Sequence, residues 1–110
     1  MEIATVQNIY NFKARVYDAV VDYCAANAIR FIPFWPVGGG DLTTDEAIAA
    51  IESRYGMSPA QIALAWLLQR SPTMLPIAGT SSVAHLEENV AACGITLEAI
   101  DVAALDALAN

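Results

Sequence analysis

The chain has 110 residues, of which 56% are hydrophobic and 15% charged, and its formal net charge is −7. Lys13 is its single lysine, so the sequence lacks the clustered cations that bind nucleic acid or an anionic membrane. Cys24 and Cys93 stand in apolar helical patterns and, with a single histidine, form no metal-binding spacing. We therefore expect buried reduced thiols, no metal, no nucleic-acid or membrane partner, and a cytoplasmic protein.

In chain order, a β-branched run over residues 3–8 predicts a first strand. Apolar residues that recur at helical spacing then predict a helix over residues 13–26; they are Val16, Ala19, Val20, Tyr23 and Cys24. Residues 29–35 are nearly all apolar and predict a second, parallel strand covered on both faces. Because proline donates no backbone hydrogen bond, Pro33 and Pro36 are expected to end the pairing of that strand near Phe34.

The second half of the chain predicts mainly helices. Residues 43–46 and 58–61 each match a capping box; the first opens a helix that ends at Gly56, and the second opens a helix that should be buried through Leu68. Residues 74–78 predict a third strand. The next helix ends at Gly94 and should bury Val83, Leu86 and Val90, and a last acidic helix is marked by Ile100, Ala104, Leu105 and Leu108.

The predicted order, β-α-β-α-α-β-α-α, indicates parallel strands joined by helical crossovers. Three strands neither close a barrel nor protect their own edges, so we expect residues 1–110 to form one incomplete barrel segment. No Gly-x-Gly-x-x-Gly follows the first strand, which argues against a dinucleotide-binding doubly wound fold. Glycine-containing loops follow the second and third predicted strands instead, as they follow the last two strands of a (βα)8 barrel that binds phosphate.

The turn from Gly79 through Thr80 and Ser81 into the next helix is the main candidate site. Glycine permits a close approach to a ligand, and the first amides of a helix are free to bind a phosphate. The same residues are also typical of an ordinary capped strand–helix loop, so the pattern alone leaves both interpretations open.

Residues 76–89, together with Val6-Gln7-Asn8 and residues 58–66, closely resemble the aldo-keto reductase family. The resemblance runs the whole length of the chain. It implies strands six to eight of a (βα)8 TIM barrel, that is, the C-terminal, nicotinamide-cofactor-binding part of a reductase. The complete enzyme would reduce aldehydes and ketones to alcohols with hydride from NADPH.

The resemblance also implies roles for individual residues. Gln7 would bind the nicotinamide carboxamide and Phe34 would stack on the nicotinamide ring. The pyrophosphate would lie along Trp35, Pro36, Val37 and Gly38. The adenosine 2′-phosphate and ribose would lie against Gly79, Thr80 and Ser81, and the adenine end of the cofactor near His85, Glu88 and Asn89. Taken alone, Gln7, Phe34 and Trp35 could also be interior residues, and His85, Glu88 and Asn89 could be ordinary helix surface.

Gly79 and His85 stand where many family members carry lysine and arginine, which leaves NAD as an alternative to NADP. The family's catalytic tyrosine, lysine, aspartate and histidine are expected upstream of residue 1, and Tyr10, Tyr17, Tyr23 and Tyr55 lie in no matching motif. We therefore expect no catalytic residue in this chain and no activity from it alone. It could be a truncated reductase, a split-barrel subunit that binds an N-terminal barrel fragment, or a non-catalytic nucleotide-binding module; self-association through its open strand edges is also expected.

Overall fold

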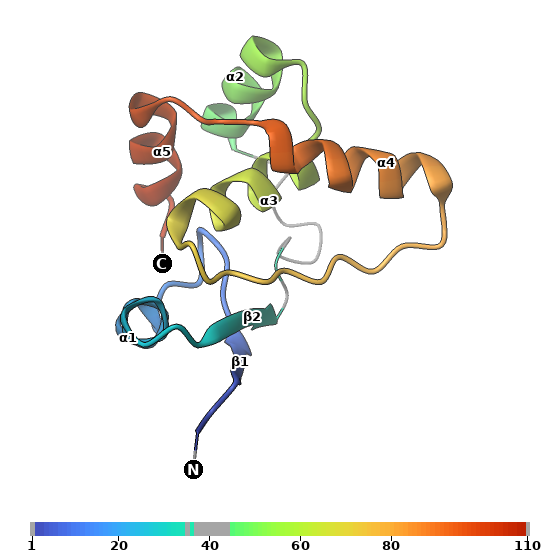
Figure 1. Ribbon diagram of the computed structural model, residues 1–110. Helices are drawn as coiled ribbons and strands as arrows, with labels where there is room; N and C mark the ends of the chain where they lie inside the picture. The colour runs from blue at the N-terminus through green and yellow to red at the C-terminus, as the bar shows by residue number, and fades with distance from the viewer. Residues whose placement is uncertain (1, 35, 37–44, 110) are drawn as a thin grey trace.

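The structure, a computed structural model, describes residues 2–34, 36 and 45–109. Its elements are β1 (Thr5–Ile9), α1 (Asp18–Ala26), β2 (Arg30–Phe34), α2 (Glu46–Tyr55), α3 (Pro59–Arg70), α4 (Val83–Ala91), the short 3-10 helix η2 (Ala92–Gly94) and α5 (Ala99–Asp106). In Figure 1, α2, α3 and α5 gather on one side of the strands, and α4 projects away from them. The chain therefore folds as an α/β unit with a short parallel sheet.

Within the part of the chain that the structure describes, the sheet has two strands, and helices cover one of its faces. β1 and β2 pair in parallel, with Val6 opposite Phe31 and Gln7 opposite Ile32. Phe31 is buried in the core and Val6 packs against it, whereas Gln7 on the opposite face is exposed. The pairing ends at Phe34, as predicted, but the expectation that this strand is covered on both faces is wrong for the described chain.

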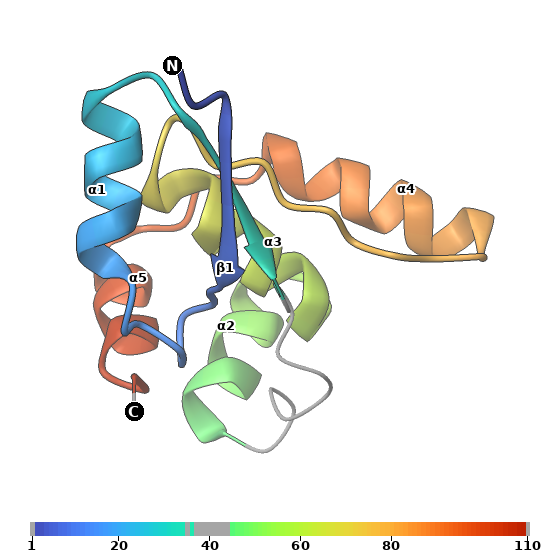
Figure 2. The ribbon, with the colours of Figure 1, turned by 90° about the horizontal axis from the view of Figure 1, so that it is seen from below.

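The predicted third strand over residues 74–78 is also wrong. Pairing with β2 starts, since the Phe31 amide donates to Thr73 O at 3.0 Å and the Leu75 amide donates to Phe31 O at 2.8 Å. It then stops after a single bridge between Phe31 and Met74. The next bond of a parallel ladder would need an amide hydrogen from Pro33, which proline does not have. The segment accordingly diverges from β2, as Figure 2 shows.

The core lies between the covered face of the sheet and α3. Residues 62–67 of α3 are all buried, as its apolar sequence predicts. The Trp66 ring packs against the rings of Tyr10 and Phe12, and the centres of the Tyr10 and Trp66 rings are 5.8 Å apart. Tyr10 also packs edge-on against Phe31, with ring centres 5.6 Å apart. These aromatic contacts attach the carboxyl end of β1 to α3.

The helix boundaries follow local chemistry that the sequence shows. Ser58 and Gln61 form the predicted capping box of α3, with Ser58 N donating to Gln61 Oε1 at 3.0 Å. Gly56 ends α2 in the left-handed conformation, at φ 64°. Of the other predicted capping box, only Asp45 and Glu46 lie among the described residues, and the Asp45 side chain makes no capping hydrogen bond. Within residues 2–34, 36 and 45–109, no helix is long and apolar enough to cross a membrane.

Not every apolar residue of the first predicted helix is buried. Val16 precedes α1 and is exposed, as is Tyr23, whereas Val21 is buried next to Cys24. Cys93 is an exposed free thiol, so the expectation of two buried cysteines holds for Cys24 alone. The helix of residues 13–26 starts late, at Asp18, because residues 11–14 form a tight turn that Asn11 closes through hydrogen bonds to the amides of Lys13 and Ala14.

The predicted inner stripe of α4 is wrong, whereas the last predicted helix is present as α5 (Ala99–Asp106). Val83, Leu86 and Val90 are exposed on α4, and Ile100 is exposed on α5. Asp101 is buried instead, because Arg54 pairs with its carboxylate and the Tyr55 hydroxyl donates to it at 2.6 Å. A buried charge that is paired in this way holds α5 against α2.

Candidate functional site

The uncovered face of the sheet carries two of the predicted site residues. Parallel register places Gln7 opposite Ile32 and Phe34 opposite Ile9. Because side chains alternate along a strand, Gln7, Ile9, Ile32 and Phe34 all point away from the helices. Gln7 is exposed and the Phe34 side chain is 55% exposed. The structure therefore brings an amide and an aromatic ring together on one open face, next to the carboxyl ends of the strands.

A polar cluster fixes the strand ends beside that face. The Tyr10 amide donates to Phe34 O at 3.0 Å, which joins the ends of β1 and β2. The buried Tyr10 hydroxyl donates to Asp18 at the start of α1. Asp18 also accepts from Arg15 Nε at 2.8 Å, and Arg70 of α3 lies 3.5 Å from it. Four parts of the chain are thus held together at one carboxylate.

Arg15 extends this cluster to the last helix. Its guanidinium donates to Asp106 at 2.9 Å and lies 4.8 Å from the centre of the Trp66 ring, whose Nε1 donates to the same carboxylate at 3.0 Å. Sequence reasoning missed this cluster. The spacing of Arg15 and Asp18, at positions three apart just before an apolar helix, is a signal that could have found part of it.

The cluster changes the acidity of its members. Burial, and then the hydrogen bond to Asp18, raises the pKa of Tyr10 to about 12. Partial burial opposes ionisation of Asp18, but hydrogen bonds from Arg15 and Tyr10 outweigh it and lower the pKa of that carboxyl. A tyrosine held protonated in this way serves as a structural donor, and its buried hydroxyl lies on the helix side of the sheet, away from the open face.

The second part of the predicted site is the turn before α4. Ser82 caps the helix, its hydroxyl accepting from the His85 amide at 3.4 Å, and Thr80 Oγ1 accepts from the Ser82 amide at 3.1 Å. Gly79, Thr80 and Ser81 are exposed. The amides of Val83 and Ala84 make no hydrogen bond to any described residue. The turn is thus an ordinary cap that still presents free helix amides to an anion.

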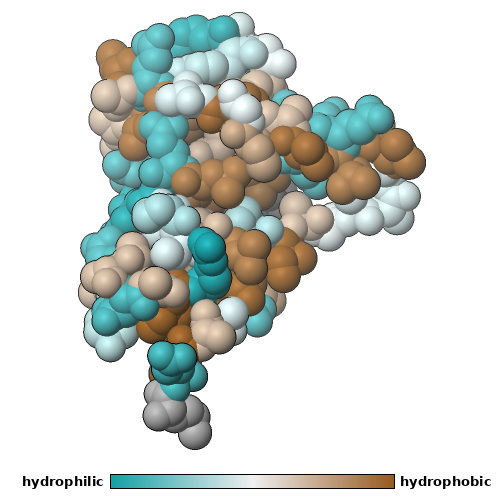
Figure 3. Space-filling view, in the orientation of Figure 1, coloured by the Kyte–Doolittle hydropathy of each residue, from teal (hydrophilic) through white to brown (hydrophobic). Residues whose placement is uncertain are grey.

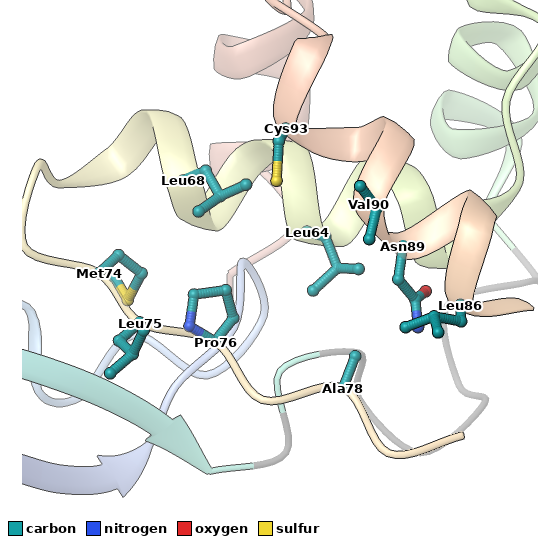
Figure 4. Close-up of a pocket in the computed structure, with 10 residues that line it drawn as sticks. All are labelled: Leu64, Leu68, Met74, Leu75, Pro76, Ala78, Leu86, Asn89, Val90 and Cys93. Carbon is teal, nitrogen blue, oxygen red and sulfur yellow. The ribbon is translucent and has the colours of Figure 1, made fainter. Parts of the chain in front are cut away.

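The side chains along α4 face different surroundings. His85 and Glu88 are exposed, whereas Asn89 lines a groove beside Leu86 and Ala78 (Figure 4). The Glu88 carbonyl accepts from Gln61 Nε2 at 3.0 Å, so the residue that completes the α3 capping box also holds α4.

The two parts of the predicted site are separate in this structure. Figures 1 and 2 both show the turn at the outer end of the projecting α4, away from the sheet. Pro36 follows β2 and is half-buried, and the predicted pyrophosphate residues Trp35, Val37 and Gly38 lie outside the described residues. Among residues 2–34, 36 and 45–109, no group of three or more histidine, cysteine or acidic side chains could hold a metal ion.

Comparison of the sequence with known proteins identifies similar families and relatives. The model of the Aldo/keto reductase family matches residues 1–110. Pyridoxine 4-dehydrogenase of Escherichia coli is 44% identical over 109 residues, 99% of this chain and 38% of that enzyme. An uncharacterized oxidoreductase of Schizosaccharomyces pombe is 47% identical over 105 residues, 94% of this chain and 34% of that protein.

Solved structures match the fold as well. A thermostable aldo-keto reductase in complex with epalrestat superimposes with a TM-score of 0.88 at 27% identity, over 97% of this chain and 40% of that one. An aldo-keto reductase from Klebsiella pneumoniae in complex with NADPH gives a TM-score of 0.87 at 26% identity, over 96% of this chain and 39% of that one. The chain thus spans about two fifths or less of the length of these relatives.

Proposed function

This chain belongs to the aldo/keto reductase family, and from that premise we propose that it is the C-terminal, cofactor-binding part of an NADPH-dependent carbonyl reductase. β1 and β2 would be strands six and seven of the family barrel, and the 74–78 segment, which makes a single bridge here, would stand in the place of strand eight. The complete enzyme would reduce aldehydes and ketones to alcohols, in the cytoplasm, where Cys24 and Cys93 stay as free thiols.

The observation that carries the proposal is the placement of Gln7 and Phe34 on one uncovered sheet face at the carboxyl ends of two parallel strands. Ligands of parallel α/β folds bind at those strand ends. The exposed Phe34 ring offers a flat apolar surface on which the nicotinamide would stack, and the Gln7 amide can both donate to and accept from a carboxamide.

The phosphate end of the cofactor would bind at the turn before α4. The amides of Val83 and Ala84, which bond to no residue that the structure describes, suit an anion together with the positive end of the helix dipole. Thr80 and Ser81 would add hydroxyl donors, and His85 and Asn89 would lie near the adenine with Glu88. Because no lysine or arginine stands at Gly79 or His85, NAD remains the alternative cofactor.

When bound, the dinucleotide supplies the hydride, and the residues of this chain bind and orient it. The proton for the carbonyl oxygen would come from the family tetrad in the rest of the barrel. The buried Tyr10 hydroxyl already donates its hydrogen to Asp18, so we do not propose Tyr10 as that proton donor. We therefore propose that the chain alone binds nucleotide without catalysing reduction.

Titration with NADPH and with 2′-phospho-ADP-ribose, which lacks nicotinamide, tests the proposed roles. Phe34→Ala should weaken NADPH binding by roughly three- to tenfold, the size of an aromatic stacking contribution, and leave 2′-phospho-ADP-ribose binding unchanged. Tyr23→Ala, which removes an exposed ring from α1, is the matched control. Equal losses for both ligands would remove Phe34 from the nicotinamide site, and absence of nucleotide binding would refute the proposed function.

Catalysis is tested separately with an aromatic aldehyde and NADPH. No turnover is expected from the purified chain, so measurable reduction would refute the claim that the proton donor lies elsewhere. Nucleotide binding that never leads to turnover, even with the rest of a family barrel supplied, would favour the non-catalytic nucleotide-binding module.

A further inference from the structure

Tyr10 links the open face of the sheet to the helices that cover the opposite face. Its backbone amide donates to Phe34 O at 3.0 Å, where the pairing between β1 and β2 ends. Phe34 is the last residue of β2, and its exposed ring is the one that would stack on the nicotinamide. The direction of that ring depends on the backbone that carries it, and therefore on where Tyr10 is held.

The Tyr10 side chain is fixed on the covered side of the sheet. It is fully buried, and its ring centre lies 5.6 Å from that of Phe31 and 5.8 Å from that of Trp66 in α3. Its hydroxyl donates to Asp18 at the start of α1. Ring packing and a hydrogen bond to a charged group thus hold the side chain against two helices, while its amide holds the end of β2.

The carboxylate that accepts from Tyr10 is itself held in place. Arg15 Nε donates to Asp18 at 2.8 Å, and Arg70 of α3 lies 3.5 Å from the same oxygen. Arg15 also donates to Asp106 of α5 at 2.9 Å, so its planar guanidinium bridges two carboxylates. Asp18 is therefore a firmly placed acceptor and not a mobile surface group.

We propose that Tyr10 is a positioning residue for the nicotinamide end of the cofactor site: anchored through its side chain to Asp18, it holds the Phe34 end of β2 so that the Phe34 ring stacks on the ligand. Tyr10 acts through Phe34 and touches no ligand, because its own side chain is buried on the covered face. The proposal rests on the proposed function, from which it takes the stacking role of Phe34.

The effect of Tyr10 should be confined to this end of the cofactor, because the phosphate-binding turn has its own supports. Thr80 and Ser82 accept from backbone amides of that turn, at 3.1 and 3.4 Å. In the part of the chain that the structure describes, no hydrogen bond or ion pair joins Tyr10 or Asp18 to residues 79–85. Figure 3 likewise shows α4 as an arm that stands away from the strands.

A second tyrosine–aspartate pair in the chain provides a matched control. The Tyr55 hydroxyl donates to buried Asp101 at 2.6 Å and accepts from the Glu98 amide at 2.9 Å. Both partners belong to α5 or its N-cap, so this tyrosine joins two helices and not the strand ends. Tyr55→Phe removes the same kind of bond as Tyr10→Phe and should also lower stability, but it should leave the direction of the Phe34 ring unchanged.

The experiment titrates the full chain with NADPH and with 2′-phospho-ADP-ribose, using variants that circular dichroism shows to be folded. Tyr10→Phe should weaken NADPH binding by roughly threefold, part of an aromatic stacking contribution, and should leave 2′-phospho-ADP-ribose binding within about 1.5-fold. Tyr55→Phe should leave both affinities within about 1.5-fold. In the Phe34→Ala background, Tyr10→Phe should not weaken NADPH binding further, because the ring through which it acts is already absent.

Hydrogen exchange of the unliganded chain adds a measurement that needs no nucleotide. The amide of residue 10 should exchange roughly tenfold faster in Tyr10→Phe than in Tyr55→Phe, because its bond to Phe34 O then opens locally. Global unfolding alone would accelerate exchange in both variants, so the difference between them reports the strand end.

Four results would overturn the inference and leave the proposed function standing: an unchanged NADPH affinity in Tyr10→Phe, equal losses for the two ligands, the same loss in Tyr55→Phe, or a further loss in the Phe34→Ala background. If the wild-type chain binds no nucleotide, the proposed function fails and hydrogen exchange decides the inference. Faster exchange in Tyr10→Phe would then support the hold of Tyr10 on Phe34, and equal rates in the two variants would overturn it.

Discussion

Removing one oxygen atom tests the polar cluster that holds the strand ends. In the Tyr10→Phe variant the ring keeps its contacts with Phe31 and Trp66, at centre distances of 5.6 and 5.8 Å. The hydrogen bond to the Asp18 carboxylate is lost, and bonds to charged groups contribute about 1.5–3 kcal/mol. Asp18 keeps Arg15 at 2.8 Å and is itself partly exposed, so no charge is stranded. We therefore expect the free energy of unfolding to fall by about 1.5–2 kcal/mol at pH 7, near the lower end of that range.

The same variant should change the dependence of stability on pH. The pKa of Tyr10 is raised from 10.0 to about 12 in the folded chain, first by burial and then by its hydrogen bond to Asp18. The unfolded chain therefore releases this proton first, and the stability that Tyr10 contributes is complete below pH 10 and is lost as the pH rises through 12. Phenylalanine has no proton to release, so the difference between the two proteins should shrink over that range.

Urea unfolding followed by circular dichroism, at pH 7 and at steps between pH 10 and 12, measures both effects. Tyr23→Phe removes the same atom from a side chain that is 62% exposed, and should change the free energy of unfolding by less than about 0.5 kcal/mol. A Tyr10→Phe loss no larger than that control, or a loss that stays constant up to pH 12, would refute the reasoning.

Three further substitutions test the local structure by the same unfolding assay. Gly56→Ala should lower the free energy of unfolding by about 1–2 kcal/mol, because the backbone there is left-handed at φ 64°, although an added Cβ would meet nothing within 4 Å. Gly94→Ala is the control, since that site is equally open and has no positive φ; its loss should be smaller, and equal losses would contradict the argument. Ser58→Ala should cost about 1 kcal/mol by opening the α3 capping box, whereas the exposed Ser81→Ala should not. Leu67→Ala should cost about 2–5 kcal/mol, since Leu67 is fully buried, and a cost under 1 kcal/mol would mean that α3 is not the core helix.

Local chemistry made many of the elements predictable. Ser58 and Gln61, Gly56 and Gly94 mark helix ends through interactions within a few residues, and β1 and β2 appear where the β-branched and apolar runs lie. Predictions that depended on partners elsewhere were less reliable. Val83, Leu86 and Val90 form an apolar stripe as expected, but a stripe does not indicate what covers it, and here nothing described does. Asp101 is buried because Arg54 and Tyr55 reach it from another helix, a pairing that its own neighbourhood does not show.

The candidate site divides in the same way. The resemblance on residues 76–89 and around Gln7 identified the family, which the match over residues 1–110 confirms, while the roles of the individual site residues stay predictions. That Gln7 and Phe34 share one face depends on the register between β1 and β2, which a short sequence pattern does not reveal.

By itself, the sequence determined the family, the strand–helix order up to α3, the capping box of α3 and the glycine that ends α2, because each depends on residues that are close along the chain. Only the tertiary structure decided that residues 74–78 separate from β2, that Tyr10 and Asp18 join four parts of the chain, and that an apolar groove stays open beside α4. The first two features arise from contacts between different segments of the chain. The groove stays open because no described residue covers Leu86 and Val90.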